Sequence, residues 1–203
     1  MATRREFIVS IPATVGVLAA ATSCSSETTA DGYANAVSNT WRHGKADAGD
    51  KSALLRELVR CATLAPSSHN TQCWKFRLED RSISIVPDFS RRCPAVDPDD
   101  HHLFVSIGCA AENLFQAALA NGLYGNAVFD DSAGTALRVA LEPTKAVATS
   151  LYNAIPERQS TRAEYDGKPI SVSELALLER AGQGNGVRAI LLTERMAMEK
   201  VLE

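Results

Sequence analysis

The organisation of the chain is decided in residues 61–76, which read CATLAPSSHNTQCWKF. An apolar helix enters this stretch, and we expect Pro66 to end it, because proline lacks a backbone donor and clashes with the preceding turn. Small polar residues follow, and the alternating run Trp74–Leu78 predicts a strand. One short loop between helix and strand therefore carries hydroxyl, carboxamide and imidazole groups. Such groups suit a flat ligand whose edge alternates hydrogen-bond donors and acceptors.

Hydrophobic periodicity predicts the elements around this loop. We expect helices at residues 52–65, 103–123 and 174–181, a short helix carrying Tyr33, Val37 and Trp41, and a helix opening at Thr193. We expect strands at residues 74–78, 83–86, 127–129, 136–141 and 187–192. The first two of these strands flank the residues Glu79-Asp80-Arg81 and form a hairpin.

Two of the expected helices have clear apolar faces. The helix at 52–65 should bury a stripe of Leu54, Leu58, Cys61, Ala62 and Ala65, and expose Arg56, Glu57 and Arg60. The helix at 103–123 is apolar nearly all round, Val105 included, which predicts a buried helix. Cys61 and Cys109 are then expected to be buried, reduced thiols.

Composition narrows the function. With 203 residues, 45% of them hydrophobic, the chain is long enough for one ordinary globular domain. The net charge of −3 and the lack of a basic block argue against a nucleic-acid partner. The five cysteines form no C-x-x-C pair. Residues 97–102, DPDDHH, crowd acidic and histidine side chains, but neighbours on a polar loop rarely converge on one ion, so we predict a helix cap and no metal site.

The amino terminus carries an export signal. Arg4 and Arg5 precede the apolar run 8–21, a pattern typical of a twin-arginine signal and too short for a stable membrane span. Residues 21–24, ATSC, resemble a lipoprotein cleavage site with Cys24 as the lipidated residue, and ordinary cleavage nearby is the alternative. We therefore expect a signal peptide at 1–24, a spacer and short helix at 25–50, and a periplasmic protein or one anchored by lipid to the outer face of the membrane.

The central loop resembles the FMN-binding turn of the nitroreductase-like flavoproteins, Ala-Pro-Ser-Ser-x-Asn-x-Gln-Pro-Trp. The matching residues are Pro66, Ser67, Ser68, Asn70, Gln72 and Trp74, and Cys73 stands where the family has proline. Without the resemblance the same residues would be an ordinary polar loop, since Ser and Asn are common in loops. The resemblance extends to Arg91-Arg92, to the turn 97–99 and to residues 106–114.

A second motif resembles another part of the same family. Residues 158–162 read RQSTR and are followed by YDGKP at 165–169. In the family, an Arg-x-Ser-x-Arg motif binds the FMN phosphate and ribityl chain, which implies that role for Arg158, Ser160 and Arg162. Two guanidinium groups with a hydroxyl between them can bind a phosphate bidentately. Unaided, such a motif is more often a solvated surface pair.

A weak internal repeat relates two segments. The helix, loop and strand of 52–78 parallel those expected over 174–192. This resembles the Acg-type subgroup, in which one chain holds two nitroreductase-like units. The resemblance implies an α+β fold, with a mixed β-sheet flanked by helices and a long buried helix. It further implies a first unit at 51–150 and the start of a second, truncated unit at 151–203.

The resemblance implies an FMN-dependent oxidoreductase. Electrons would pass from a small-molecule donor through the flavin to a nitro compound, a quinone or a similar acceptor. Two alternatives stay open: an FMN-sequestering protein without turnover, and a non-functional remnant. A homodimer is a further expectation. The sequence argues against a serine hydrolase using Ser67 or Ser68 with His69, because the chain has no G-x-S-x-G elbow and adjacent residues cannot adopt triad geometry.

Overall fold

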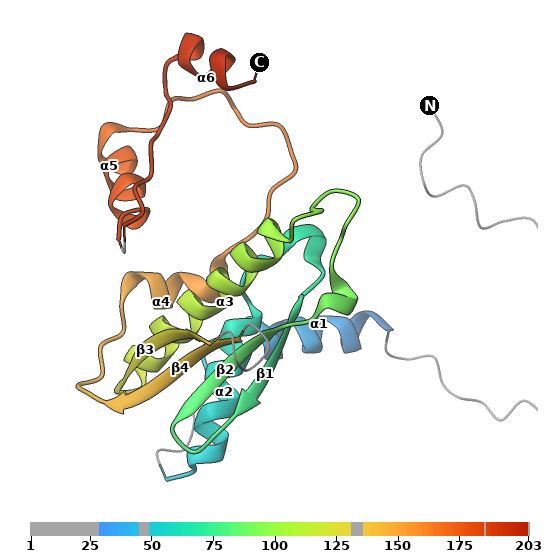
Figure 1. Ribbon diagram of the computed structural model, residues 1–203, viewed down its shortest axis with the longest axis vertical. Helices are drawn as coiled ribbons and strands as arrows, with labels where there is room; N and C mark the ends of the chain where they lie inside the picture. The colour runs from blue at the N-terminus through green and yellow to red at the C-terminus, as the bar shows by residue number, and fades with distance from the viewer. Residues whose placement is uncertain (1–28, 45–48, 131–135, 185, 203) are drawn as a thin grey trace, which may run out of the picture. The chain divides into compact units, whose positions relative to one another are not determined.

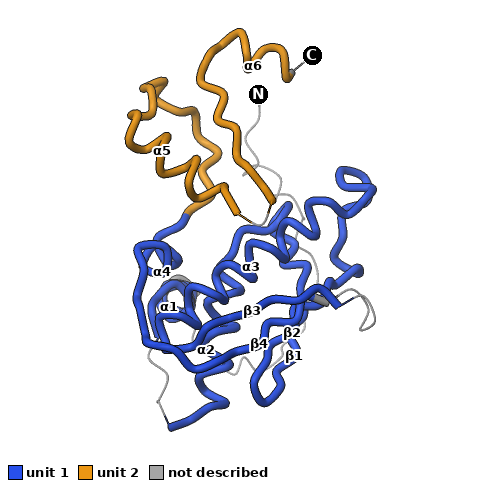
Figure 2. The backbone as a smooth tube through the Cα atoms, turned by 60° about the vertical axis from the view of Figure 1, so that its left-hand side comes forward, with its two compact units in different colours: residues 1–158 blue, residues 159–203 orange. Residues whose placement is uncertain are grey.

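The computed structural model describes residues 29–44, 49–130, 136–184 and 186–202. The chain divides into two compact units, residues 1–158 and residues 159–203 (Figure 2). The predicted signal peptide and Cys24 lie outside the described residues, so both stay predictions.

Unit 1 holds helices and a sheet, and unit 2 holds two helices (Figure 1). The elements of unit 1 are α1 (Thr29–Thr40), α2 (Lys51–Thr63), η1 (Ser68–Asn70), β1 (Trp74–Leu78), β2 (Ser82–Pro87), η2 (Phe89–Arg91), α3 (His101–Ala120), β3 (Leu123–Asp130), β4 (Ala136–Pro143), α4 (Ser150–Ala154) and η3 (Ile155–Glu157). Those of unit 2 are α5 (Val172–Ala181) and α6 (Arg195–Leu202).

The four strands form one sheet in the order β1-β2-β4-β3. Phe76 lies opposite Ile85, and Ile85 lies opposite Leu137, so the expected hairpin of β1 and β2 is confirmed. Helix α3 packs against β2, β3 and β4, and α2 packs against α3. The α+β class is confirmed. Every strand pair among the described residues is antiparallel, and the two pairs of consecutive strands, β1–β2 and β3–β4, are joined directly as hairpins.

The core of unit 1 lies between the sheet and these two helices. Leu58 from α2, Leu114 from α3 and the strand residues Ile83, Ile85 and Val139 are fully buried. Burying one such side chain contributes about 1.5–3 kcal/mol. This core fixes the end of α2 and the start of β1, which carry the central loop between them.

Helix α2 forms where the periodicity predicts it. The Asp50 side chain accepts a hydrogen bond from the Ala53 N–H at 2.9 Å and caps the helix. The helix ends at Thr63 with Leu64 as its C-cap, because Ala65 precedes Pro66 and the position before a proline is disfavoured in the α conformation. Leu55 joins the buried stripe, whereas Leu54 is only partly buried.

Two charged residues of α2 were predicted to be exposed, but both are largely buried. The side chains of Glu57 and Arg60 are only 12% and 19% exposed. Glu57 accepts a hydrogen bond from the Gly44 N–H at 3.0 Å, and Arg60 donates to the Arg42 carbonyl at 2.7 Å. Burial raises the pKa of Glu57, but the hydrogen bonds from Arg60 and Gly44 and the charges of Arg60 and Arg42 together lower it below its ordinary value. The pair thus fastens the segment before α2 to the helix.

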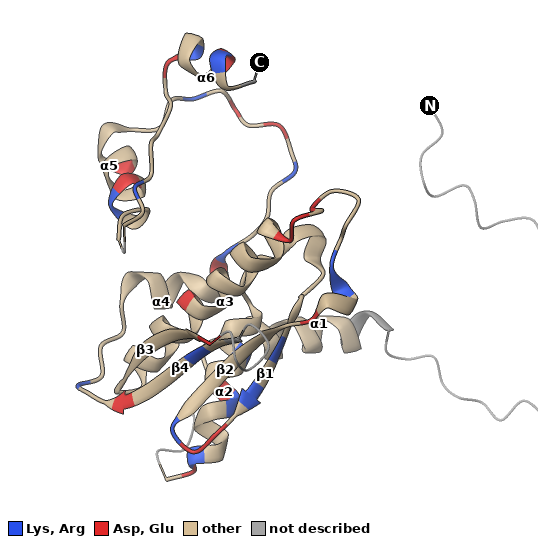
Figure 3. Ribbon diagram, in the orientation of Figure 1, with Lys and Arg blue, Asp and Glu red and all other residues tan. Residues whose placement is uncertain are grey.

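Helix α3 is confirmed, but its full burial is not. Val105 is 64% exposed, and Gly108 and Glu112 are exposed at helical spacing from it. Figure 3 shows α3 almost free of Lys, Arg, Asp and Glu. The sheet and α2 cover only part of the helix circumference, which explains the exposed face. Among described residues, α3 is also the one helix long and apolar enough to cross a membrane. A buried core helix has the same composition, and α3 packs on the core of unit 1.

The four cysteines of the described residues are free thiols. Cys61 is buried as predicted, and burial raises its pKa to about 11. Cys109 is a free thiol as predicted, but it is only partly buried, so its predicted burial was wrong. It lies one residue from the exposed stripe of α3, where the sheet no longer covers the helix.

Unit 2 confirms one expectation and corrects another. Helix α5 confirms the helix expected at 174–181, and Ser171 and Glu174 form a capping box at its start. The strand expected at 187–192 is wrong, since only an isolated bridge joins Gly184 to Val187. A lone strand would leave its backbone groups without partners. The second copy of the repeat therefore keeps its helix but lacks its strand.

Two glycine substitutions test the packing of β3 on α3. A Cβ atom at Gly125 would lie 2.6 Å from Cδ1 of Phe115, so Gly125→Ala should destabilise the protein by about 1–3 kcal/mol. At Gly108 nothing lies within 4 Å, so Gly108→Ala should stabilise α3 by up to about 1 kcal/mol. Urea denaturation measures both free energies of unfolding. Equal effects of the two changes would contradict this packing.

Candidate functional site

The loop between α2 and β1 has an unusual backbone. His69, Asn70 and Gln72 have φ angles of 51°, 55° and 49°, in the left-handed region. This region costs a residue with a Cβ atom about 1–2 kcal/mol, although Asn and His enter it more readily than most residues do. Such strain persists only where the surrounding structure enforces it, and it gathers at functional sites.

Hydrogen bonds within the loop enforce part of this conformation. The Ser67 hydroxyl accepts from the Gln72 N–H at 3.0 Å, which closes the loop on itself. The Thr71 hydroxyl donates to the Ser68 carbonyl at 3.0 Å. From outside the loop, Arg91 donates to the Thr71 carbonyl at 3.1 Å. Ser67 therefore shapes the loop.

Ser106 attaches the loop to helix α3. Its buried hydroxyl accepts from the Ser68 N–H at 3.1 Å and donates to the His102 carbonyl at 2.6 Å. Sequence reasoning placed Ser106 in a matching segment but gave it no role. A serine inside a helix that bonds back to the carbonyl four residues earlier is common, so the pattern alone gave no signal.

The start of α3 is fixed next to this contact. The Asp97 carboxylate accepts hydrogen bonds from the His102 and Leu103 N–H groups at 3.1 and 3.0 Å, which confirms the predicted helix cap. Burial raises the pKa of Asp97, but these bonds outweigh burial and lower it. Cys73, at the position of the family's proline, is buried and its thiol lies 3.8 Å from the Leu103 carbonyl. The packing of Cys73 against α3 therefore holds the C-terminal end of the loop in place.

Several polar groups of the loop point away from these contacts. Asn70 and Gln72 are exposed, and their carboxamides make no hydrogen bond to other described residues. The hydroxyl of Ser68 likewise has no partner among the described residues, and Pro66 is exposed beside it. A fixed backbone thus presents a hydroxyl and two carboxamides for a ligand.

Arg158, the last residue of unit 1, is brought next to the loop. Its Nη2 atom donates to the Leu64 carbonyl at 3.2 Å, two residues before Pro66. Its guanidinium carbon lies 5.7 Å from the ring centroid of Trp41, within the range of a cation–π contact. The bond to Leu64 therefore holds Arg158 beside the loop within one unit, and the contact with Trp41 is one that sequence reasoning missed.

The other two residues of the predicted phosphate motif belong to the second unit. Ser160 and Arg162 belong to unit 2, where both are exposed. Of the eight residues predicted to bind the cofactor, six therefore belong to unit 1 and two to unit 2.

Neither a metal nor an enclosed ligand is indicated at the loop. No group of three or more His, Cys, Asp or Glu side chains converges within the described part of the chain. A cavity of about 10 Å³ lies under the loop, which is close to the space needed for one water molecule. A larger ligand would therefore bind on the outer side of the loop.

The geometry defines an α+β protein with a strained, polar turn between a core helix and an edge strand, and this turn is the candidate ligand site. Two proteins from strains of Mycobacterium tuberculosis, each named "Putative NAD(P)H nitroreductase", are 28% identical over 151 residues. The match covers 70% of this chain and 43% of theirs, so the chain spans less than half their length. This similarity agrees with the family resemblance of the motifs.

Structural comparison gives weaker likenesses. A "Putative NADH Oxidase" from Clostridium acetobutylicum has a TM-score of 0.38 at 17% identity, covering 55% of this chain and 89% of that one. A nitroreductase family protein from Streptococcus pneumoniae has a TM-score of 0.39 at 17% identity, covering 68% and 96%. No family model matches the chain.

Substitutions at Gln72 test the strain in the turn. Gln72→Gly should be more stable than Gln72→Ala by about 1 kcal/mol, because only glycine adopts a positive φ without a steric penalty. Both changes remove the same carboxamide, so their difference isolates the backbone. Chemical denaturation at neutral pH measures it. Were the alanine variant at least as stable, residue 72 could not occupy the left-handed region in solution.

Proposed function

We propose that this chain binds FMN and acts as an FMN-dependent oxidoreductase of the nitroreductase-like class. One observation carries the proposal: the strained turn fixes Ser68, Asn70 and Gln72 so that their side chains stay without partners among the described residues. The sequence similarity to the two mycobacterial proteins named as nitroreductases supports an oxidoreductase.

The exposed groups of the turn fit the polar edge of a flavin. That edge offers one donor, N3–H, and the acceptors O2, O4 and N5. A carboxamide both donates and accepts, so Asn70 and Gln72 can serve either kind of ring atom. Ser67 shapes the backbone through its bond to the Gln72 N–H, and Pro66 fixes the entry to the turn.

We assign the FMN phosphate to two arginines and a serine in the segment that follows η3. Arg158, Ser160 and Arg162 fall within five consecutive residues, so the chain itself keeps them near one another. Arg158 is already oriented by the Leu64 carbonyl and by Trp41, which lowers the entropy lost when it binds an anion. A planar guanidinium can bind a phosphate bidentately.

The cofactor would supply the electron transfer, and the protein would bind and orient it. Small-molecule donors and acceptors then complete the reaction. We also propose export by the twin-arginine route, which Arg4 and Arg5 support, with Cys24 lipidated or the signal cleaved nearby.

A thermal-shift titration tests cofactor binding. FMN at one hundred times its Kd should stabilise the native state by about 2.7 kcal/mol and raise the melting temperature by several degrees. In the Arg158→Ala, Arg162→Ala double variant this FMN-induced rise should largely vanish. Each variant is compared with its own cofactor-free melting curve, so any loss of intrinsic stability cancels.

The matched control is Arg188→Ala in unit 2. Arg188 is exposed, and its weak pair with Glu179 is 4.0 Å long. This variant should keep the full shift. An unchanged wild-type melting curve at high FMN excess would refute cofactor binding. Binding without oxidation of added NAD(P)H would instead identify the sequestering alternative.

A further inference from the structure

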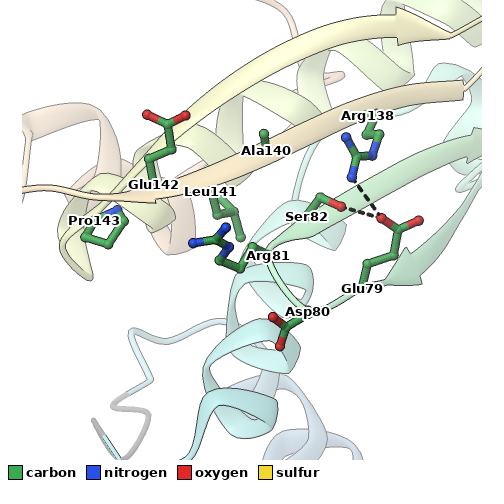
Figure 4. A pocket seen from close by; sticks show the side chains of 9 residues that line it. All are labelled: Glu79, Asp80, Arg81, Ser82, Arg138, Ala140, Leu141, Glu142 and Pro143. Carbon is green, nitrogen blue, oxygen red and sulfur yellow. Dashed lines mark hydrogen bonds and ion pairs between the residues drawn. The ribbon is translucent and has the colours of Figure 1, made fainter.

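A hollow of about 220 Å³ lies at the other end of β1 from the turn. We call it the hairpin hollow, and its lining residues are Lys51, Leu54, Leu55, Asp80, Arg81, Leu123, Leu141 and Pro143. An open cleft of about 720 Å³ adjoins it and shares four of these residues (Figure 4). All belong to unit 1.

The walls of the hairpin hollow are apolar. Leu54 and Leu55 come from α2, Leu123 from β3, and Leu141 and Pro143 from β4. Leu55 and Leu141 are buried in the core, so the floor of the hollow is held in place. A water molecule in liquid takes about 30 Å³, so the hollow has room for roughly seven groups of that size. This suits a short alkyl chain.

The rim of the hollow has one positive charge in excess. Lys51 and Asp80 form an ion pair, and the hydrogen bond from Lys51 lowers the pKa of Asp80. The guanidinium of Arg81 has no hydrogen bond or ion pair to another described residue. Because the Arg81 carbonyl accepts from the Leu141 N–H at 2.9 Å, the backbone beneath this cation is fixed.

Neighbouring charges leave Arg81 available. Glu79 is engaged by Ser82 and by Arg138, the latter at 3.2 Å. Figure 4 shows both contacts, and it shows the Glu142 carboxylate pointing away from Arg81. The charge of Arg81 also helps to lower the pKa of Asp80, but Asp80 is ion-paired with Lys51, so no described acidic group forms an ion pair with Arg81.

We propose that the hairpin hollow binds a small aliphatic carboxylate, with its alkyl chain between the leucines and its head group on Arg81. A neutral hydrocarbon would leave the cation unused, and a cationic amphiphile would be repelled by it. Apolar walls with one placed charge are the usual make-up of a small-molecule site. The site is separate from the turn and does not depend on the proposed flavin chemistry.

Titration of the full chain with sodium octanoate, followed by leucine methyl NMR, tests the site. The methyl signals of Leu54, Leu55, Leu123 and Leu141 should shift and saturate together. Arg81→Gln should weaken binding about fivefold, the upper range for an exposed ion pair. The uncharged probe octanol should bind wild type as weakly as octanoate binds the variant.

The matched control is Arg77→Gln, an exposed arginine of the same hairpin that does not line the hollow. It should leave the octanoate affinity unchanged. Leu123→Phe fills the hollow and should abolish the saturable shifts, while the rest of its spectrum shows that the chain is folded. The proposal is overturned by shifts that do not saturate, by shifts spread equally over the leucines of α5, by octanol binding as tightly as octanoate, or by Arg77→Gln acting like Arg81→Gln.

Discussion

The hydrogen bond from the Ser68 N–H to the Ser106 hydroxyl is the constraint on which the candidate site depends. It ties a strained loop to α3, the helix that packs against three of the four strands. A second bond, from the Asn113 carboxamide to the Cys61 carbonyl at 3.1 Å, ties α3 to α2. The helix that enters the loop and the helix beneath it are thus parts of one rigid core.

This support explains how three residues with side chains can occupy the left-handed region. The core holds both ends of the loop, so relaxing His69, Asn70 or Gln72 would break hydrogen bonds and packing elsewhere. The same arrangement leaves the carboxamides of Asn70 and Gln72 exposed and without a hydrogen bond to other described residues. A local sequence that violates backbone preference without a structural gain is expected at a ligand site.

Sequence reasoning predicted α2 and β1 well, because their apolar periodicities are strong and Pro66 marks the boundary between them. It failed where contacts distant in sequence decide the outcome. Glu57 is held largely out of solvent with a hydrogen bond from Gly44, and residues 187–192 pair with no strand among the described residues. In the candidate site the motif gave the residues of the turn. It could not give positive φ angles at non-glycine positions or the role of Ser106, since neither leaves a pattern in the sequence.

The visible absorption spectrum of the purified full chain tests the central claim most directly. The protein is saturated with FMN, freed of unbound cofactor by gel filtration, and compared with an Asn70→Ala, Gln72→Ala double variant treated alike. The account predicts that wild type retains the two absorption bands of oxidised flavin and releases FMN on denaturation, while the double variant elutes with much less. A colourless wild-type protein, or equal retention by both, would contradict the assignment of the turn as the flavin site.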